Sequence, residues 1–375
     1  ALITAAVLAL VALFGMTGCP NNAGGSGSGG GGGNSGGGGT PTPVYTQVPY
    51  GTNGADLKAW LQNNAAAAPA VNYIELTGVT RDHLSGSVGN PSPLGKIIQD
   101  SGKKVALKLP ETVDQIGGRA FYKCTALTGI DLSACTHLWV GAKIYGYAFA
   151  KCTELKTVTF GGARFLEIEQ FAFEGCTALS SADMSGCPSL EKIDMWAFQD
   201  CTALKEVRLP EKLTTIGTDA FKNCPIETLV INCNITGSII DELTQEDKDQ
   251  NKEEDKGSVK EHLKTLRLGE GVTVIGKYAF FECMGLTQID LSACTALAQI
   301  GERAFSDCTT LEAADFSACP NLRGIDMNAF NGCDALRSAD LSRCTLLTEI
   351  KDGAFFFCKQ AEVTLPESLQ TIGNG

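Results

Sequence analysis

One arrangement of apolar positions recurs nine times along the chain. An Ile is followed four and five residues later by Ala-Phe, then usually by a Cys, a Leu and a short apolar run. The Phe residues of the nine copies are spaced 28, 24, 25, 23, 59, 25, 25 and 25 residues apart: Phe121, Phe149, Phe173, Phe198, Phe221, Phe280, Phe305, Phe330 and Phe355. A fixed period in the twenties indicates one small supersecondary unit stacked on copies of itself. The predicted fold is therefore a solenoid, with a core that runs as a ribbon between neighbouring coils.

Within one copy, the apolar pattern predicts a short strand followed by a return path. Ile289 and Leu291 alternate with period two, which favours a strand that directs both side chains inward. Gln288, Asp290 and Ser292 then face outward. Further Leu and Ile residues at spacings of three carry the chain across the other side of the coil. The Ala-Phe pair places a small and a large residue where successive coils stack, so each coil depends on its neighbours to cover its interior.

Residues 50–110 precede the first clean repeat and are predicted to form an N-terminal cap, because a terminal coil exposes an apolar face that needs an atypical cover. The expected elements are helices over residues 55–68 and 94–101 and strands over residues 71–76 and 105–109. Both strands are expected to join the solenoid sheet. Trp60, on the same helix face as Leu57 and Leu61, is interpreted as a plug under the cap rather than a platform for a ligand.

The N-terminal residues have the pattern of an export signal. Residues 1–15 are almost wholly apolar or small and run into Cys19, after which the composition changes to Gly, Ser and Asn. A secretory signal is therefore predicted over residues 1–19. The small residues before Cys19 resemble a bacterial lipobox, and that resemblance implies cleavage before Cys19 and lipidation of its thiol; an uncleaved anchor and ordinary secretion are the alternatives. The glycine-dominated residues 20–49 are expected to form a flexible tether.

Both ends of the sequence suggest a longer chain. The basic start of a signal peptide is missing before residue 1, and the last residues, Ile372 to Gly375, stop where another Ala-Phe pair is due. We therefore expect a few further residues before the sequence and further coils after it.

The repeat resembles a known family. The phrase Ile-Gly-Glu-Arg-Ala-Phe that ends at Phe305, followed by Cys308 and Leu311, is similar to the BspA-like leucine-rich repeats of bacterial surface proteins, including those of spirochaetes and oral anaerobes. The resemblance covers roughly residue 116 to the end, within a predicted solenoid domain of residues 111–375. It implies an α/β-type solenoid: a right-handed leucine-rich-repeat coil with short parallel strands on the concave face, an irregular or short-helical convex side and the α/β cap at its N-terminus. Such proteins are implicated in adhesion to host or matrix proteins and to other cells, but none of their binding residues is carried over here.

The period breaks between Phe221 and Phe280. Residues 241–256 contain eight acidic residues, three lysines and one aliphatic side chain. Such a stretch cannot bury itself, so an exposed acidic loop is predicted over residues 241–260, in place of the Ala-Phe half of one coil. A docking element and a tolerated surface insertion are both consistent with this composition.

Fifteen cysteines follow Cys19, and their spacing is that of the repeat. Five pairs lie eleven residues apart, for example Cys283 with Cys294 and Cys308 with Cys319. Residues at one phase of the coil are expected to pack as a ladder of small apolar side chains with free, buried thiols. Disulfides remain an alternative, because export favours them and neighbouring coils are within bonding reach. Metal-binding spacing such as C-x-x-C is absent from the sequence.

The outward positions of the strands supply the candidate binding residues. Asp290, Asp315 and Asp340 share one phase in three consecutive coils and are expected to form a row about 5 Å apart. Each Asp is interpreted first as a turn former whose side chain bonds to its own backbone. The alternative is a strip that binds Ca²⁺ or a basic partner. The full set of candidate binding residues on the strand face is Asp131, Asp183, Arg208, Arg267, Gln288, Asp290, Asp315 and Asp340.

Charge and residue usage exclude several functions. The net charge of −12 and pI near 4.8 argue against nucleic-acid and anionic-membrane partners, because such partners require clustered Lys and Arg. The three histidines, His83, His137 and His262, share no repeat phase, so neither a metal site nor a catalytic triad is predicted. No carboxylate pair stands out of register, and no enzyme activity, small-molecule substrate or cofactor is predicted apart from the Ca²⁺ alternative.

The resulting hypothesis is a lipid-anchored, non-catalytic repeat protein of a bacterial cell envelope, exposed on the outer membrane surface. Its extended strand face binds an extracellular protein or glycan, and it contacts the membrane only through its N-terminal lipid. The first alternative is a structural scaffold of the envelope that meets no host ligand. A glycan hydrolase is a third interpretation, and it would require a pair of out-of-phase carboxylates.

Overall fold

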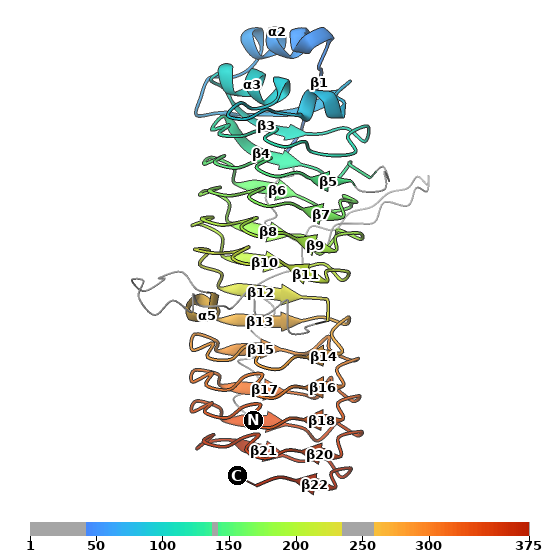
Figure 1. Cartoon of the computed structure of the whole chain (residues 1–375), viewed down its shortest axis with the longest axis vertical. Coiled ribbons are helices and arrows are strands. Elements are labelled where there is room, and N and C mark those ends of the chain that lie inside the picture. The colour runs from blue at the N-terminus through green and yellow to red at the C-terminus, as the bar shows by residue number, and fades with distance from the viewer. Residues whose placement is uncertain (1–42, 137–141, 235–258, 375) are drawn as a thin grey trace, which may run out of the picture. The chain divides into compact units, whose positions relative to one another are not determined.

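The computed structural model describes residues 43–136, 142–234 and 259–374, and it arranges them as a stack of coils joined by parallel strands (Figure 1). The predicted signal peptide with Cys19, His137 and all but the last two residues of the predicted acidic loop lie outside the described residues. Two columns of strands run along the stack, one of longer strands and one of two-residue strands.

The longer strands form the first column, which we call the strand face. Each of these strands contributes side chains that alternate between the core and the solvent. In β10, for example, Val207 is buried between Glu206 and Arg208, and it pairs in register with Ala182 and Leu229 of the neighbouring coils. The members of the column are β4 (Leu127–Asp131), β6 (Thr157–Thr159), β8 (Ser181–Asp183), β10 (Glu206–Arg208), β12 (Thr228–Ile231), β13 (Thr265–Leu268), β15 (Gln288–Asp290), β17 (Ala313–Asp315), β19 (Ser338–Asp340) and β21 (Glu362–Thr364).

A second column consists of two-residue strands that end at the Ile preceding each Ala-Phe pair. Its members are β5 (Lys143–Ile144), β7 (Glu167–Ile168), β9 (Lys192–Ile193), β11 (Thr215–Ile216), β14 (Val274–Ile275), β16 (Gln299–Ile300), β18 (Gly324–Ile325), β20 (Glu349–Ile350) and β22 (Thr371–Ile372). The side away from the longer strands was predicted to be irregular or short-helical. Turns do surround the Ala-Phe pairs there, but the second strand column is an addition that the sequence analysis missed.

The anchor phenylalanines form the centre of the core. Consecutive rings stack nearly parallel with centroids 4.9–5.3 Å apart, from Phe121 to Phe221 and again from Phe280 to Phe355. The prediction that successive coils stack at their Ala-Phe pairs is therefore confirmed within each of these two runs. The Ala before each Phe is buried, and in seven of the nine copies its carbonyl accepts a hydrogen bond of 2.7 or 2.8 Å from the Phe N–H of the preceding coil. A larger side chain at the Ala position would push these turns apart.

The described cysteines are all free thiols, and fourteen of the fifteen are buried. The Sγ of Cys201 donates a hydrogen bond to the carbonyl of Phe173 at 3.2 Å, and Cys308 does the same to Phe280 at 3.2 Å. A thiol suits this position because it is small and apolar yet can donate to a carbonyl of the preceding coil. Burial raises the pKa of Cys283 and Cys294 to about 12, so these thiols are not nucleophilic at neutral pH.

The cap consists of two helices and three strands that extend the strand face. Parallel pairing runs from β1 through β2 and β3 to β4. Helix α3 fits closely against the first coil, because a Cβ at Gly95 would collide with the carbonyl of Ala120. The elements are β1 (Thr46–Pro49), η1 (Thr52–Gly54), α2 (Ala55–Asn63), β2 (Val71–Thr77), η2 (Arg81–Leu84), α3 (Pro93–Asp100) and β3 (Lys104–Lys108).

Three details of the cap differ from the sequence-based expectation. Strand β1 lies in residues 46–49, which were assigned to the flexible tether, so ordered structure begins earlier than residue 50. Helix α2 ends at Asn63 rather than at residue 68, because the Asn72 side chain bonds both the N–H and the carbonyl of Ala66 at 2.8 and 3.2 Å. Trp60 packs against the core but is only partly buried, so it is not a complete plug.

The break in the period leaves the strand face continuous. Strands β12 and β13 pair directly, with Thr228 opposite Thr265 and Ile231 opposite Leu268, although residues 232–264 separate them in sequence. Helix α5 (Val259–His262) leads into β13, and Val259 is buried. Residues 259 and 260 are therefore helical and not part of an exposed loop as predicted, because Val259 belongs to the core.

Candidate functional site

Most of the predicted binding residues lie in one column on the strand face. They occupy the third position of their strands, where Asp183 is opposite Arg208, Arg267 is opposite Asp290, and Asp315 is opposite Asp340. Asp131 has the same position at the N-terminal end of the column. Gln288 occupies the first strand position and is exposed. The structure thus brings the eight candidates onto one face, but along the stack rather than into one cluster.

The aspartates of this column are used locally. In every case Oδ1 accepts a hydrogen bond of 2.8–3.0 Å from the backbone N–H of the Ser two residues later, for Asp131, Asp183, Asp290, Asp315 and Asp340. This is the turn-forming interpretation. At Asp340, bonds from the hydroxyl and N–H of Ser342 lower the carboxyl pKa. Among the described residues, no group of three or more His, Cys, Asp or Glu side chains is arranged to hold a metal ion.

Two arginines interrupt the aspartate column. The Arg208 guanidinium is held by Glu206 at 2.7 Å and lies 3.8 Å from Asp183 on the neighbouring strand. The Nε of Arg267 lies 3.8 Å from Asp290, and this buried atom has no hydrogen-bond partner. Arg208 is thus held by its neighbours, whereas the Nε–H of Arg267 has no hydrogen-bond acceptor among the described residues.

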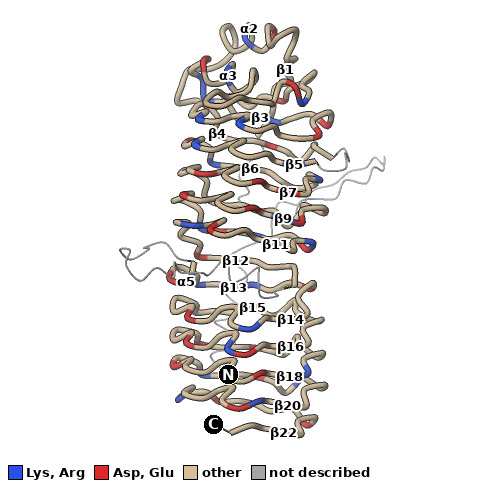
Figure 2. The backbone as a smooth tube through the Cα atoms, viewed as in Figure 1, with Lys and Arg blue, Asp and Glu red and all other residues tan. Residues whose placement is uncertain are grey.

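A second set of ion pairs lies beside the arginines. Glu227 sits between Lys205 at 2.7 Å and Lys264 at 2.8 Å, and these bonds lower its pKa to about 2. We call the combined group the charged band: Asp183, Lys205, Glu206, Arg208, Glu227, Lys264, Arg267 and Asp290. It spans neighbouring coils from β8 to β15, within a stack on which acidic and basic residues are intermixed (Figure 2).

The coils beyond the charged band have a plainer strand face. The first strand position there is Ala313 in β17 and Ser338 in β19, and both side chains are short. Asp315 and Asp340 follow one another in adjacent strands without an intervening cation. The strand face therefore carries fewer charged side chains in β17 and β19 than in the charged band.

The sequence analysis missed a further surface feature, which we call the aromatic column. It lies two residues before the anchor phenylalanines. The Tyr147 and Phe171 rings stack with centroids 4.8 Å apart, and Phe171 stacks on Trp196 at 4.9 Å. Arg119 covers one end, 4.7 Å from the Tyr147 centroid, and Trp196 Nε1 donates to Asp219 at 3.3 Å at the other. All five side chains are half-buried.

These positions have an unfavourable backbone conformation for large residues. Tyr147, Phe171 and Trp196 have φ angles of 60°, 59° and 58°, in the left-handed region that glycine tolerates best. Each such residue costs about 1–2 kcal/mol in backbone strain. Ring stacking offsets part of this strain. An aromatic residue at one phase of three consecutive repeats was the sequence signal that could have identified the column.

Comparison with known proteins now assigns the repeat. Residues 99–138, 141–242 and 259–375 match the model of the BspA type leucine rich repeat region, in six copies. The chain belongs to this family. The matched residues include β3 of the cap and every strand from β4 onward, and with them the charged band and the aromatic column.

Several solved structures of leucine-rich-repeat proteins resemble this BspA-type chain. A leucine-rich cell-surface protein from Faecalibacterium prausnitzii is 24% identical, with 70% of this chain and 79% of that chain covered and a TM-score of 0.28. A leucine-rich-repeat protein of T. pallidum is 23% identical, with 55% and 77% covered and a TM-score of 0.33. One from Bacteroides ovatus is 20% identical, with 74% and 76% covered and a TM-score of 0.27. No curated protein matches the sequence.

The family sets the general role of this BspA-type protein. Leucine-rich-repeat solenoids are typically non-enzymatic scaffolds that bind proteins, and BspA-type repeats occur on bacterial cell surfaces. In the part of the chain that the structure describes, no helix has both the length and the apolar character needed to cross a bilayer. The functional question is therefore which surface binds a partner.

Proposed function

We propose that this chain is a lipid-anchored protein of a bacterial cell surface that binds an extracellular protein through the charged band. The observation that supports the proposal most directly is the pair Arg208 and Arg267, which lie on either side of Val230 of β12 in one rigid ladder among intermixed charges. Arginine is over-represented at the energetic centres of protein interfaces. Charges of both signs on one face favour selection of a partner with the complementary pattern.

The band is organised before a partner arrives. Inter-coil strand pairing fixes the backbone of each charged residue, and Glu206 fixes the Arg208 side chain. Little conformational entropy then remains to be lost when a partner docks. The Arg267 side chain is 43% exposed, and a partner carboxylate placed beside the exposed part of its guanidinium would gain a charge-assisted hydrogen bond.

The binding proposal can be tested by a solid-phase screen of the full chain, in detergent, against extracellular matrix proteins and glycans, with and without Ca²⁺. For a protein that binds, we expect Arg208→Ala and Arg267→Ala each to weaken binding about tenfold. Lys212→Ala is the matched control, because Lys212 is exposed and lies outside the charged band.

Failure of every protein to bind would contradict the proposal, as would equal losses in the arginine variants and the Lys212 control. Binding that requires Ca²⁺ would move the site from the arginines to the row of Asp315 and Asp340. Binding to glycans alone would also contradict the proposal, and a loss of that binding in the arginine variants would assign sugar recognition to the strand face.

The lipid anchor is a separate part of the proposal and is supported by the sequence around Cys19. A diacyl or triacyl group would hold a soluble domain at a membrane, because each buried CH₂ contributes about 0.8 kcal/mol. In cells that produce the protein, we expect the native chain to enter the detergent phase on Triton X-114 partitioning and to incorporate a labelled fatty acid. Cys19→Ala is expected to abolish both, and retention of the label in this variant would contradict lipidation at Cys19.

A structural scaffold inside the envelope is the second candidate function, because the same repeat surface could connect envelope components. Protease added to intact cells distinguishes the two. The surface-protein proposal predicts digestion of the repeat domain on intact cells, whereas protection until the outer membrane is opened would favour the scaffold.

A further inference from the structure

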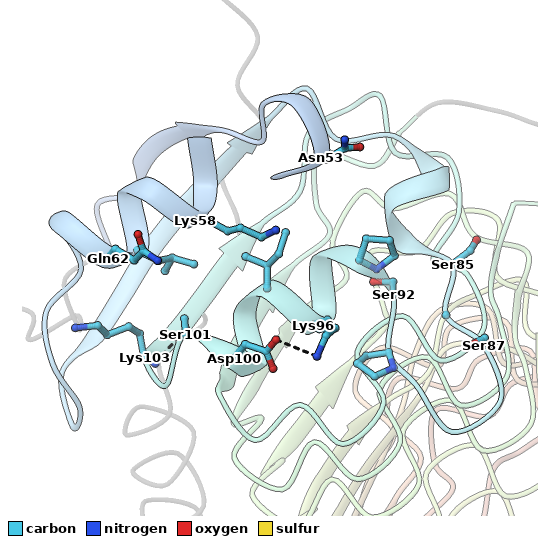
Figure 3. A pocket seen from close by; sticks show the side chains of 15 residues that line it. Asn53, Lys58, Gln62, Ser85, Ser87, Ser92, Lys96, Asp100, Ser101 and Lys103 are labelled. Atoms are coloured by element: carbon cyan, nitrogen blue, oxygen red, sulfur yellow. Dashed lines mark hydrogen bonds and ion pairs between the residues drawn. The ribbon is translucent and has the colours of Figure 1, made fainter. Parts of the chain in front are cut away.

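The cap contains a cavity that is separate from both strand columns. It has a volume of about 810 Å³ and lies between α2, the segment that follows η2, and α3. Figure 3 shows Lys58 of α2 and the Lys96–Asp100 pair of α3 facing this space. A cavity of this size is in the range that proteins use for small ligands.

The floor of the cavity is apolar and firmly held. It is lined by Leu61 of α2 and Ile97 of α3, both of which are buried, and by the rings of Pro91 and Pro93. Helix α3 cannot shift easily, because Gly95 packs against the first coil and Ser92 caps the helix through a 3.0 Å bond from Gly95 N–H. The apolar floor is therefore preorganised for a flat, C–H-rich ligand face.

The rim of the cavity carries a local positive charge in an acidic protein of net charge −12. Lys96 is neutralised by Asp100 at 3.0 Å, and Lys103 donates to the Ala65 carbonyl at 3.1 Å, which leaves its charge uncompensated. Lys58 is exposed and makes no hydrogen bond or ion pair with any residue that the structure describes. The Lys58 ammonium thus faces the cavity without a carboxylate partner, whereas the Lys103 side chain points away from Lys58 (Figure 3).

Neutral polar groups complete the rim. The side chains of Asn53, Gln62 and Ser87 are exposed and form no hydrogen bonds within the described ranges. Together they supply both donors and acceptors, as a ligand with several hydroxyl groups requires. An acyl chain would need an enclosed apolar channel, whereas this cavity is bordered by amides, hydroxyls and ammonium groups.

We propose that the cap cavity binds an acidic saccharide. The apolar faces of one or two sugar rings would lie on Leu61, Ile97 and the proline rings. Sugar hydroxyls would bond to the amide and serine side chains, and a carboxylate or sulfate would pair with Lys58. This site is distinct from the charged band, so it adds a second ligand class to the proposed protein-binding function.

The test uses the full chain in detergent and isothermal titration with four probes: oligogalacturonate, its methyl ester, a heparin-derived oligosaccharide and dextran. The methyl ester has the same rings without the charge. We expect at least one acidic oligosaccharide to bind, and the methyl ester and dextran to bind at least tenfold more weakly or not at all. Preference for the carboxylated or the sulfated probe would identify the acidic group.

Variants locate the site. Lys58→Glu is expected to weaken binding of the acidic probe at least tenfold, Lys58→Gln less, and Lys212→Glu, an equal charge change far from the cap in sequence, hardly at all. Thermal unfolding of each variant checks that the exposed substitutions leave the fold intact. Arg208→Ala and Arg267→Ala should bind the probe normally, so a failure of the strand-face proposal remains distinguishable.

Three results would overturn the inference. One is the absence of binding by either acidic probe, and another is equal binding of oligogalacturonate and its methyl ester. The third is an equal loss in Lys58→Glu and Lys212→Glu, which would place the interaction elsewhere on the protein.

Discussion

The two halves of the solenoid, residues 116–233 and residues 263–374, can be compared position by position because their coils share one period. Inside, they are nearly the same: the Phe149 and Phe173 rings stack at 4.9 Å, and the Phe305 and Phe330 rings stack at 5.1 Å. Outside, they differ. The position two residues before each Phe is aromatic in three consecutive coils of the first half, but in the second half it is Tyr278, Arg303, Asn328 and Gly353.

The second strand column shows the same contrast. In the first half its outward residues alternate in charge, and Glu167 bridges Lys143 at 2.6 Å and Lys192 at 2.8 Å. In the second half the corresponding residues include Val274, Gln299, Gly324 and Glu349, which form no such ladder among the described residues. Interior side chains contact only the neighbouring coils, so the repeat constrains them in the same way in both halves. Surface side chains contact solvent or partners, so the residues at these positions can differ between the two halves.

The largest predicted effect tests whether the two interiors are equivalent. Phe173→Ala and Phe305→Ala each remove a fully buried ring that stacks on two neighbours, and each is expected to lower the free energy of unfolding by about 3–5 kcal/mol. Chemical denaturation followed by circular dichroism measures both losses. A difference between the two variants of more than about 2 kcal/mol would mean that the halves do not share one kind of core.

The second-largest predicted effect concerns the aromatic column, which lies in the first half. Phe171→Ala removes two ring contacts of the aromatic column and is expected to cost about 1–2 kcal/mol, because Ala keeps the Cβ and with it the strain of the positive φ. Asn328→Ala, at the same position of a later coil, should cost less than about 0.5 kcal/mol. Equal losses in these two variants, measured by thermal unfolding, would show that the aromatic stack contributes nothing to stability.

The thiols are expected to behave alike in both halves. Cys201→Ala and Cys308→Ala each delete a sulfur that bonds a Phe carbonyl of the preceding coil, and each should cost about 1 kcal/mol. The carbonyl keeps its bond from the N–H of its own turn, which limits the loss. Unfolding in denaturant compares the two variants, and a stabilising effect of either would contradict the assigned role of the thiol.

The smallest effect concerns pH. Burial opposes ionisation of Glu167, but bonds from Lys143 and Lys192 outweigh it and hold the pKa below its ordinary value of 4.5. Ionised Glu167 therefore stabilises the fold above pH 4.5, and this contribution is lost as the pH falls through the lowered pKa. Glu167→Gln should cost up to about 1 kcal/mol at pH 7 and nothing at pH 2.

Glu349→Gln serves as the control for this prediction, because Glu349 has the same column position without the two flanking lysines. It should leave the pH dependence of unfolding unchanged. If unfolding of the Glu167 and Glu349 variants had the same pH dependence, the charge ladder of the first half would not be a difference in stability between the halves.

Much of the interior was predictable because one signal repeats nine times. The phase of Phe121 and its successors gave the stack, and the alternation around Ile289 gave the strand face. The two-residue strands were missed because Gln299 and Ile300 are too few residues to show alternation. Strand β1 was missed because Val48 is its one core side chain and pairing with β2, distant in sequence, decides its conformation.

The candidate site was predictable in outline only. The phase of Asp290 and Arg208 placed them correctly on the strand face, and the Ser two residues after Asp290 was consistent with a turn. Whether the Nε–H of Arg267 finds an acceptor depends on the distance between two coils, which cannot be read from the sequence. The aromatic column was missed because the sequence analysis looked for apolar positions that fill the core. It did not consider aromatic residues at a repeat position whose backbone conformation disfavours them. The cap cavity lies outside the repeat, so no periodic signal marks it.

The direct pairing of β12 with β13 has a practical consequence. Because the register across this junction is set by the strands and not by the length of chain between them, the junction is a natural place to graft a foreign peptide or a fluorescent reporter. The spacing between coils would stay the same on both sides of such a graft. The two halves could then be labelled separately or exchanged as modules.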